Sequence, residues 1–290
     1  MIKIPFVEFY ITNVCDLACE NCNRFNNFQR KGRVDWDESQ YTEFAKHLDI
    51  ETVSIIGGEP LNHPGIIDYI KGIRKLWPKT NIIITSNGLA INRRKHLYEY
   101  CITYGVMLEI SFHDVDNVDK VIMNEIDLFT KNNGIAWQGP LTETVHHIDR
   151  NNNPFTSEAQ YMRDQKGFRI DFTPAHVFGS CAVERFDGNI PMPHNSDPKE
   201  AYHQCGLKNS PTFHNGMFYK CGMIAAGKEF ATEYKAQEHW RELFEYKPVS
   251  PEDLSTNGWQ QDFYRAEPVC RLCPENIEYS KCITSIKGKT

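Results

Sequence analysis

The chain has 290 residues, of which 40% are hydrophobic and 24% are charged, and its net charge is −6. This length allows one large α/β domain, or a domain of about 200 residues followed by a smaller one. The acidic balance leaves no extended basic surface, and no apolar run approaches the roughly 20 residues that cross a bilayer, so we expect neither duplex nucleic acid nor a membrane as a partner.

The N-terminal sequence lacks the charged and apolar regions of a secretory signal peptide, which predicts a cytoplasmic protein. Its ten cysteines could form a disulfide scaffold in an oxidising compartment. In the cytosol thiols stay reduced, and closely spaced cysteine pairs favour metal binding. The cysteine pattern therefore indicates metal sites rather than disulfides.

Short apolar runs rich in β-branched residues alternate with helical patterns over the first 175 residues. The strand-like runs are 6–12, 52–56, 81–86, 106–112, 135–139 and 168–173, and the helix-like stretches are 37–47, 64–77, 93–104 and 118–132. A fifth crossover is expected over 151–166, where the helical periodicity is weakest. Strands joined by helical crossovers pair in parallel, so six such units predict a parallel sheet that is open or curls into a barrel.

Three cysteines follow the first predicted strand with the spacing C-x3-C-x2-C: Cys15, Cys19 and Cys22. Three thiolates at this spacing can hold three irons of a [4Fe–4S] cube and leave the fourth iron open to a substrate or cosubstrate. They fall at the carboxyl edge of the predicted sheet, where ligand sites of α/β folds gather. A structural zinc site would need a fourth ligand, and the nearest candidates, His47 and His63, belong to other elements.

The second strand is followed directly by Gly57, Gly58, Glu59 and Pro60. Two glycines let the backbone approach a ligand closely and expose its amides, and a carboxylate can accept a hydrogen bond from an ammonium group. An ordinary turn would have the same composition.

The third and fourth strands carry further polar residues in the same register. Ser86 and Asn87 end the third strand, and on the fourth strand Glu109, Ser111 and His113 share one face by alternation. The predicted site therefore draws on the ends of four consecutive strands.

These motifs resemble those of radical S-adenosylmethionine (SAM) enzymes. The cysteine triad is similar to the C-x3-C-x2-C of that family, residues 57–60 to its Gly-Gly-Glu motif, and residues 86–88 to the element that contacts the SAM ribose. The resemblance covers about 110 residues, and the alternation of strands and helices extends it to about 175. It implies a partial (β/α)6 TIM-like barrel in which SAM is cleaved reductively to a 5′-deoxyadenosyl radical that abstracts hydrogen.

The resemblance also assigns roles to residues at the strand ends. Gly57, Gly58 and Glu59, in the motif that Pro60 completes, would hold the methionine ammonium of SAM. The SAM ribose and carboxylate would lie near Ser86, Asn87 and Ser111. One position departs from the family pattern, because Asn21 stands where an aromatic residue usually packs on the adenine.

After residue 175 the pattern changes, and residues 176–204 read as a linker rich in Pro, Gly, Asn and His. Residues 212–220 predict a hairpin with Asn-Gly as its turn. The spacing Cys205-x10-Gly216-x4-Cys221, followed by Cys270-x2-Cys273, is similar to a shortened SPASM, or twitch, domain. This arrangement resembles that of the dehydrogenases of aminocyclitol biosynthesis.

This second resemblance implies a small α+β domain over 205–290 that binds one auxiliary [4Fe–4S] cluster as an electron relay or acceptor. Its ligands would be the four cysteines of that spacing, Cys205, Cys221, Cys270 and Cys273. Four thiolates with one C-x2-C pair would also suit a structural zinc ion.

The catalytic residues are open at this point. His113, Glu143, His146 and Asp171 are candidates for a general base or a substrate contact, although histidines in surface loops often have no such role. Cys101 lies in a predicted helix and reads as a buried apolar residue. Cys181 and Cys282 could be spare thiols, alternative ligands or catalytic groups.

The sequence thus predicts a radical SAM oxidoreductase that dehydrogenates, or forms a bond in, a small-molecule or nucleotide-derived substrate. Flavodoxin or ferredoxin is the expected electron donor. A peptide-modifying maturase is the alternative. Such enzymes often carry a leader-binding domain before the barrel, and because the first strand here already begins near residue 5, this alternative is less favoured. A non-catalytic iron–sulfur or zinc-binding interaction protein is the alternative of another class.

Overall fold

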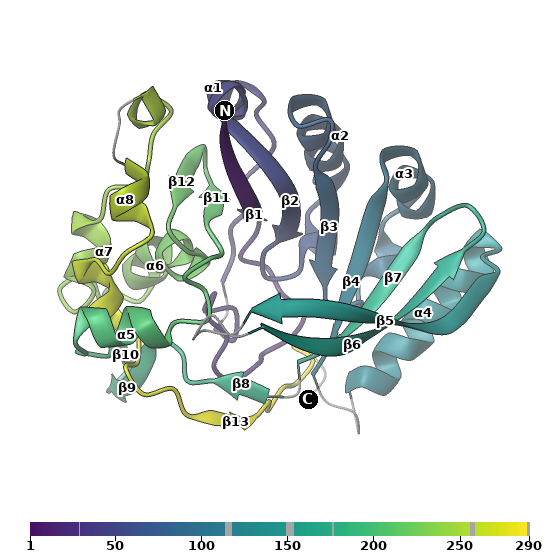
Figure 1. Cartoon of the computed structure of the whole chain (residues 1–290). Coiled ribbons are helices and arrows are strands. Elements are labelled where there is room, and N and C mark those ends of the chain that lie inside the picture. The colour runs from purple at the N-terminus through teal and green to yellow at the C-terminus, as the bar shows by residue number, and fades with distance from the viewer. Residues whose placement is uncertain (29, 114–117, 149–153, 176, 256–258, 289–290) are drawn as a thin grey trace.

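The computed structural model describes residues 1–28, 30–113, 118–148, 154–175, 177–255 and 259–288. Nine strands in this part of the chain form the main sheet: β1 (Ile2–Tyr10), β2 (Leu48–Ile56), β3 (Asn81–Ser86), β4 (Val106–Phe112), β5 (Trp137–Ile148), β6 (Pro154–Asp164), β7 (Arg169–Pro174), β11 (Thr212–His214) and β12 (Met217–Tyr219). Their order is β12-β11-β1-β2-β3-β4-β7-β6-β5 (Figure 1). β1, β2, β3, β4 and β7 pair in parallel, which confirms the predicted α/β class.

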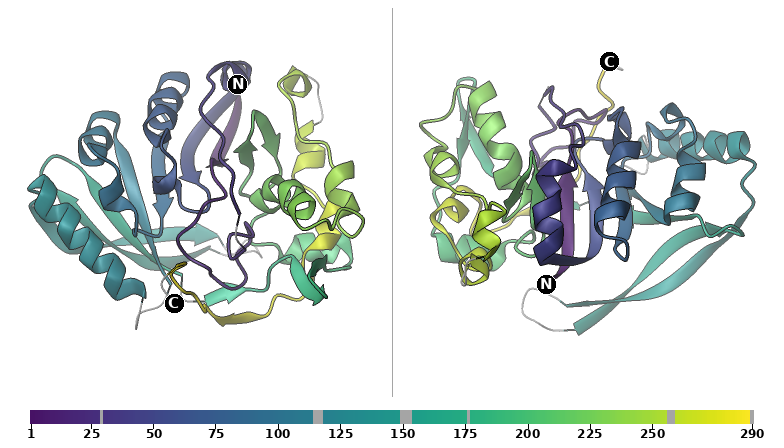
Figure 2. Two further views of the ribbon diagram at one scale, coloured as in Figure 1. Left: turned by 180° about the vertical axis from the view of Figure 1, so that it is seen from behind. Right: turned by 90° about the horizontal axis from the view of Figure 1, so that it is seen from above.

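Four helices, α1 (Ser39–His47), α2 (Ile66–Leu76), α3 (Leu97–Tyr104) and α4 (Val118–Asn133), cover one face of this sheet (Figure 2). Ile66, Ile70 and Ile73 recur at helical spacing on α2 and are fully buried. Ile82 and Ile84 alternate along β3 in the same core. Burying each such side chain contributes about 1.5–3 kcal/mol, so the periodicity that predicts these elements also holds them together.

The prediction of a fifth crossover helix over 151–166 is wrong. β6 occupies this stretch from Pro154 onward, antiparallel to β5, and β5 continues to Ile148 instead of ending near residue 139. Glu143 and His146, expected after the fifth strand, therefore lie within it. The local hydrophobic period does not reveal cross-strand pairing, which is what stabilises this hairpin.

Residues 177–204, expected to be a linker, contain β8 (Val177–Gly179), β9 (Val183–Asp187), β10 (Ile190–Pro193) and α5 (Pro198–Gln204). The predicted hairpin is confirmed. β11 and β12 pair antiparallel, and Asn215 and Gly216 have φ values of 50° and 74°, as a tight two-residue turn requires. β11 also pairs in parallel with β1, so the C-terminal part of the chain contributes strands to the same sheet as the N-terminal part.

A second hydrophobic cluster joins the loop after β1 to the C-terminal helices. Phe25 stacks on Phe230 with ring centroids 4.2 Å apart, and Trp240 meets both rings edge-on. The remaining elements are α6 (Gly222–Glu233), α7 (Arg241–Glu245), α8 (Trp259–Phe263), β13 (Tyr279–Lys281) and the 3₁₀ turns η1 (Pro60–Asn62), η2 (Ile91–Arg93), η3 (Glu252–Ser255) and η4 (Pro268–Leu272). Among the described residues, no helix is long and apolar enough to span a membrane.

Candidate active site

The three cysteines of the triad line one cavity of about 140 Å³ at the carboxyl ends of β1 to β4. The predicted SAM-site residues that line it with them are Gly57, Gly58, Ser86, Asn87 and Ser111, and His113 completes this wall. The structure therefore brings together residues that are up to about 100 positions apart in the sequence. The carboxyl ends of parallel strands lie at one edge of the sheet. Motifs that directly follow such strands in the sequence are therefore expected to come together, as these residues do.

Gly57 and Gly58 are required by the packing of the cysteine loop. The amide of Gly58 donates a hydrogen bond of 2.6 Å to the carbonyl of Thr12. A Cβ atom at Gly58 would lie 2.3 Å from the carbonyl oxygen of Val14 and 2.9 Å from Cβ of Cys15. The expectation that both glycines expose their amides to a ligand is wrong for Gly58, because its N–H is bonded to this loop.

Glu59 is completely buried and is absent from the cavity wall. Its carboxylate accepts hydrogen bonds from the hydroxyl of Ser86 (2.7 Å), the amide of Asn87 (2.7 Å) and the amide of Leu61 (2.9 Å). Burial raises the pKa of this carboxyl to about 7, although the three hydrogen bonds oppose the shift. Glu59 therefore holds the Ser86–Asn87 turn in place, and Pro60 begins the buried turn η1 behind it.

The three thiols of the triad together form a donor set that suits a metal cluster. Burial raises the pKa of the Cys15 and Cys22 thiols, and a contact with Cys282, together with burial, raises that of Cys19. A bound metal deprotonates such thiols outright, so coordination removes the cost of burying them. Cys15 Sγ also accepts a long hydrogen bond of 3.7 Å from Nδ2 of Asn87.

Of the four candidate catalytic residues, one lies on the cavity, two lie away from it, and the side chain of the fourth is not described. His113 lies on the cavity, and its backbone amide donates to Oδ1 of Asp119 at 2.8 Å. Glu143 and Asp171 both bind Arg169, each with one contact of 2.8 Å, and neither lines the cavity. His146 lies on β5 opposite residue 156, and its side chain falls outside what the structure describes.

The polar residues after the third cysteine also belong to this site, although the sequence motifs do not include them. Asn23, Arg24 and Asn26 line the cavity, and Arg24 forms a buried ion pair with Glu8 of β1. A run of polar residues directly after the triad was the available signal. Asn21, the departure from the family pattern, has a φ of 58°, a conformation that Asn tolerates better than an aromatic residue does.

The second cysteine set is also brought together. Cys205, Cys221, Cys270 and Cys273 line one small cavity, with Tyr202 and Lys220 beside them. They come from the end of α5, the start of α6 and the turn η4. Burial raises the pKa of all four thiols, that of Cys221 to about 12, so this set also suits a bound metal.

A cavity of about 260 Å³ lies between the two cysteine sets. It shares Asn23 with the triad cavity, and Cys205 and Cys273 with the second set. Cys181 also lines it, which places this thiol near both sets. Cys101 is 1% exposed in α3, which confirms that it is a buried apolar residue.

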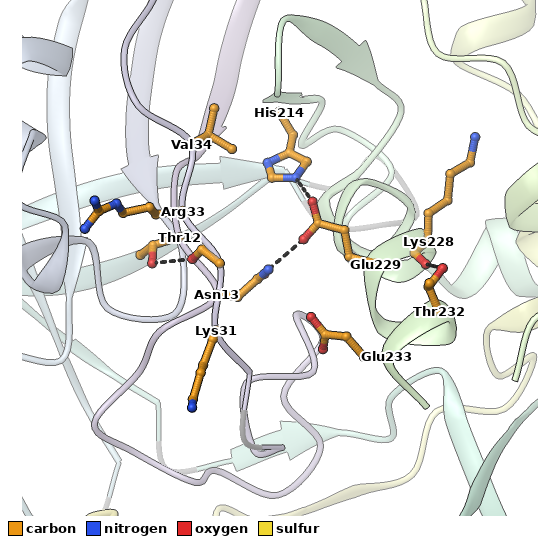
Figure 3. A pocket seen from close by; sticks show the side chains of 11 residues that line it. Thr12, Asn13, Lys31, Arg33, Val34, His214, Lys228, Glu229, Thr232 and Glu233 are labelled. Carbon is orange, nitrogen blue, oxygen red and sulfur yellow. Dashed lines mark hydrogen bonds and ion pairs between the residues drawn. The ribbon is translucent and has the colours of Figure 1, made fainter. Parts of the chain in front are cut away.

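A further cavity of about 470 Å³ lies between the loop after β1 and helix α6 (Figure 3). Glu229 connects its walls, with Oε1 3.0 Å from Nε2 of His214 and Oε2 accepting a 2.6 Å hydrogen bond from Nδ2 of Asn13 (Figure 3). Burial opposes ionisation of Glu229, but its bonds to His214 and Asn13 outweigh burial and lower its pKa to about 2. None of the predicted site residues lines this cavity.

The structure is thus an α/β protein in which three cysteines line one cavity at the strand ends. Residues 9–128 match the family described as the Radical SAM superfamily, which confirms the predicted radical SAM domain over this segment. The match contains Cys15, Cys19, Cys22, Glu59 and Asn87.

Curated relatives match over a shorter stretch. The chain is 31% identical over 95 residues to the GTP 3′,8-cyclase of Alkaliphilus metalliredigens (strain QYMF), which is 31% of this chain and 30% of that protein. It is 30% identical over 93 residues to the GTP 3′,8-cyclase of Clostridium perfringens (strain 13 / Type A), or 31% of this chain and 29% of that protein. The chain thus spans less than a third of the length of these relatives.

Two solved structures resemble parts of the fold. BtrN in complex with AdoMet and 2-DOIA is 13% identical, with a TM-score of 0.45 over 91% of this chain and 87% of that one. Streptococcus suis SuiB bound to S-adenosylmethionine is 21% identical, with a TM-score of 0.35 over 44% of this chain and 32% of that one.

Proposed function

We propose that this chain is a radical SAM enzyme whose Cys15, Cys19 and Cys22 bind a [4Fe–4S] cluster. The observation that carries the proposal is the convergence of these three cysteines with Gly57, Asn87 and their neighbours on one cavity within the family-matched segment. When bound, such a cluster supplies the electron that splits SAM into methionine and a 5′-deoxyadenosyl radical. Flavodoxin or ferredoxin is the proposed source of that electron.

Different residues of the cavity are proposed to contact different parts of SAM. Ser86, Asn87 and Ser111 present polar groups for its ribose and carboxylate, and Gly57 and Gly58 form the wall proposed for its ammonium. Glu59 acts behind this wall, because its hydrogen bonds keep the Ser86–Asn87 turn in one conformation. A turn held in this way contacts the ligand without first losing conformational freedom.

The second cysteine set is proposed to bind an auxiliary [4Fe–4S] cluster that accepts an electron. The four thiols around one cavity support a fourfold ligand set. The radical would take one hydrogen atom from a substrate C–H bond, and the substrate radical would pass one electron to the auxiliary site and release a proton. The net change is a two-electron oxidation of the substrate, which makes the protein an oxidoreductase.

The substrate is proposed to be a small or nucleotide-derived molecule in the cavity between the two sets. At about 260 Å³ this cavity is close to the lower end of the range for small-molecule sites. Its walls reach both cysteine sets, so a substrate there would lie between the hydrogen acceptor and the electron acceptor.

The test is anaerobic reconstitution followed by incubation with dithionite and SAM. We expect 5′-deoxyadenosine, and about eight irons per chain if both clusters form. Cys22→Ala should abolish the product and lower the iron content. If the wild-type protein carries its full iron but forms no 5′-deoxyadenosine, the proposal is wrong; stoichiometric zinc without iron would favour the structural alternative.

A further inference from the structure

The C-terminal segment, residues 282–287, lies along the cysteine loop. It runs antiparallel to residues 16–20, with an additional bridge between Leu17 and Ile286. The backbone hydrogen bonds are Ala18 N to Ser285 O (2.9 Å), Glu20 N to Ile283 O (2.8 Å) and Lys287 N to Asp16 O (2.7 Å). The ammonium of Lys287 also donates to the carbonyl of Phe28 at 3.1 Å. These bonds fix the beginning of the segment, Cys282, against the triad.

Cys282 meets one member of the triad and the histidine of the cavity wall. Sγ of Cys19, Sγ of Cys282 and a ring nitrogen of His113 all lie within 4.8 Å of one another. The three side chains come from the loop after β1, the end of β4 and the C-terminal segment, and each residue is at most 9% exposed. The hydroxyl of Thr284 lies 3.2 Å from Sγ of Cys19 and helps to hold this thiol in place.

Two thiols and an imidazole form a donor set for a soft divalent cation. Zinc binds thiolate sulfur at about 2.3 Å and imidazole nitrogen at about 2.0–2.1 Å, so tetrahedral zinc holds two thiolates about 3.8 Å apart. The donor atoms therefore need to move by roughly 1 Å or less to reach such a cation. Cys15 and Cys22 do not belong to this group of three donor atoms.

We propose that Cys19, His113 and Cys282 form a binding site for one thiophilic divalent cation such as Zn²⁺, which the cluster-free protein takes up. Three protein donors leave the fourth tetrahedral position to water or to a small anionic ligand. The proposal of this cation site does not depend on whether the protein cleaves SAM. One consequence does rest on the proposed function: because Cys19 cannot serve both metals, the cation and the triad cluster exclude each other.

The test is an anaerobic titration of the cluster-free full-length protein with Co²⁺, followed by its visible and thiolate charge-transfer absorption. Four thiols such as those of the second cysteine set can also bind Co²⁺, so the result is read from differences between variants. We expect Cys282→Ser and His113→Gln each to lose one bound Co²⁺, or to weaken its binding at least about tenfold. Cys22→Ser is the matched control, since it removes a triad thiol that is not part of the site.

The control separates the two ways in which the triad region could bind the metal. If Cys22→Ser loses the ion while Cys282→Ser keeps it, the triad alone binds Co²⁺ and the proposal is overturned. The same conclusion follows if the wild-type protein binds no Co²⁺ beyond that lost in Cys205→Ala. His113→Gln leaves the C-terminal segment intact, so it detects the site even if Cys282→Ser is poorly folded. Formation of 5′-deoxyadenosine is measured separately. The Co²⁺ titration can therefore be interpreted even if the protein does not cleave SAM.

Competition supplies a second measurement. Excess Zn²⁺ added during reconstitution should lower the electron paramagnetic resonance signal of the reduced triad cluster more in wild type than in Cys282→Ser. An equal loss in both proteins would show that the cation does not use Cys282.

Discussion

At the residue scale, the buried carboxyl of Glu59 makes stability depend on pH. Its pKa rises from 4.5 to about 7 on folding, so between these pH values the folded protein holds a proton that the unfolded chain has released. The contribution of Glu59 to the free energy of unfolding therefore falls as the pH rises through this window. In Glu59→Gln this titration is absent. We expect the stability of wild type relative to Glu59→Gln to fall by roughly 3 kcal/mol between about pH 4.5 and about pH 8.

Urea unfolding of the two cluster-free proteins across this pH range measures the difference directly. A difference that stays constant with pH would mean that Glu59 keeps its ordinary pKa in the folded protein. Because Glu59 lies behind the cavity, it would affect the proposed binding of SAM only through Ser86 and Asn87.

Gly58 provides a second test at this scale, because it sits where two backbones meet. The Cβ atom of Gly58→Ala would overlap the carbonyl of Val14, so the loop that carries Cys15 has to move. Overpacking of this kind costs about 1–3 kcal/mol, and here it would also displace Cys15, a proposed ligand of the triad cluster. We expect loss of triad iron and of 5′-deoxyadenosine formation. Gly206→Ala is the control, since nothing lies within 4 Å of its Cβ; wild-type iron content in Gly58→Ala would contradict the argument.

At the element scale, Glu229 ties α6 to the loop after β1 and to the β11–β12 hairpin. Its depressed pKa means that its stabilising effect is present above about pH 4.5 and is lost as the pH falls toward 2. We expect Glu229→Gln to lower the free energy of unfolding by about 1 kcal/mol at neutral pH, and by less in acid. Glu233→Gln is the control, because Glu233 contacts Arg30 at 2.9 Å but neither His214 nor Asn13. If Glu229→Gln lowered the free energy of unfolding equally at neutral and at acidic pH, ionised Glu229 would not be the source of this stabilisation.

The elements that the sequence predicts best are those whose own residues decide their structure. β3 and β4 have the predicted bounds, and the Asn-Gly turn alone is enough to place the β11–β12 hairpin. β6 could not be predicted in this way, because its stability comes from pairing with β5 rather than from its own periodicity.

In the candidate site, too, some features follow from local sequence and others from contacts between distant segments. The triad, the two glycines, Ser86 and Asn87 converge as expected because parallel strands end at one edge. The inward turn of Glu59, the pairing of Arg24 with Glu8 and the place of Cys282 beside Cys19 all depend on contacts between distant segments. No local pattern in the sequence encodes those contacts.

At the scale of the whole molecule, three cavities follow one another from the triad to the second cysteine set. Asn23 separates the first from the middle one, and Cys205 and Cys273 separate the middle one from the last. The N-terminal strands supply the first cavity, and the chain from α5 to η4 supplies the last. If the second set accepts an electron, SAM cleavage at the triad and electron transfer to the second set are chemically separable steps located at opposite ends of this series, with the proposed substrate cavity between them.

Cys205→Ala tests this separation, because it removes one thiol of the second set and leaves the triad unchanged. If the second set accepts electrons, the variant should still form 5′-deoxyadenosine, while oxidised substrate is lost and about four irons per chain remain. If the set only supports folding, cleavage and oxidation should fall together, with a lower melting temperature. Cys101→Ala is the matched control, since its buried thiol lines none of these three cavities, and it should retain both activities. Full substrate oxidation by Cys205→Ala would mean that the electron leaves by another route.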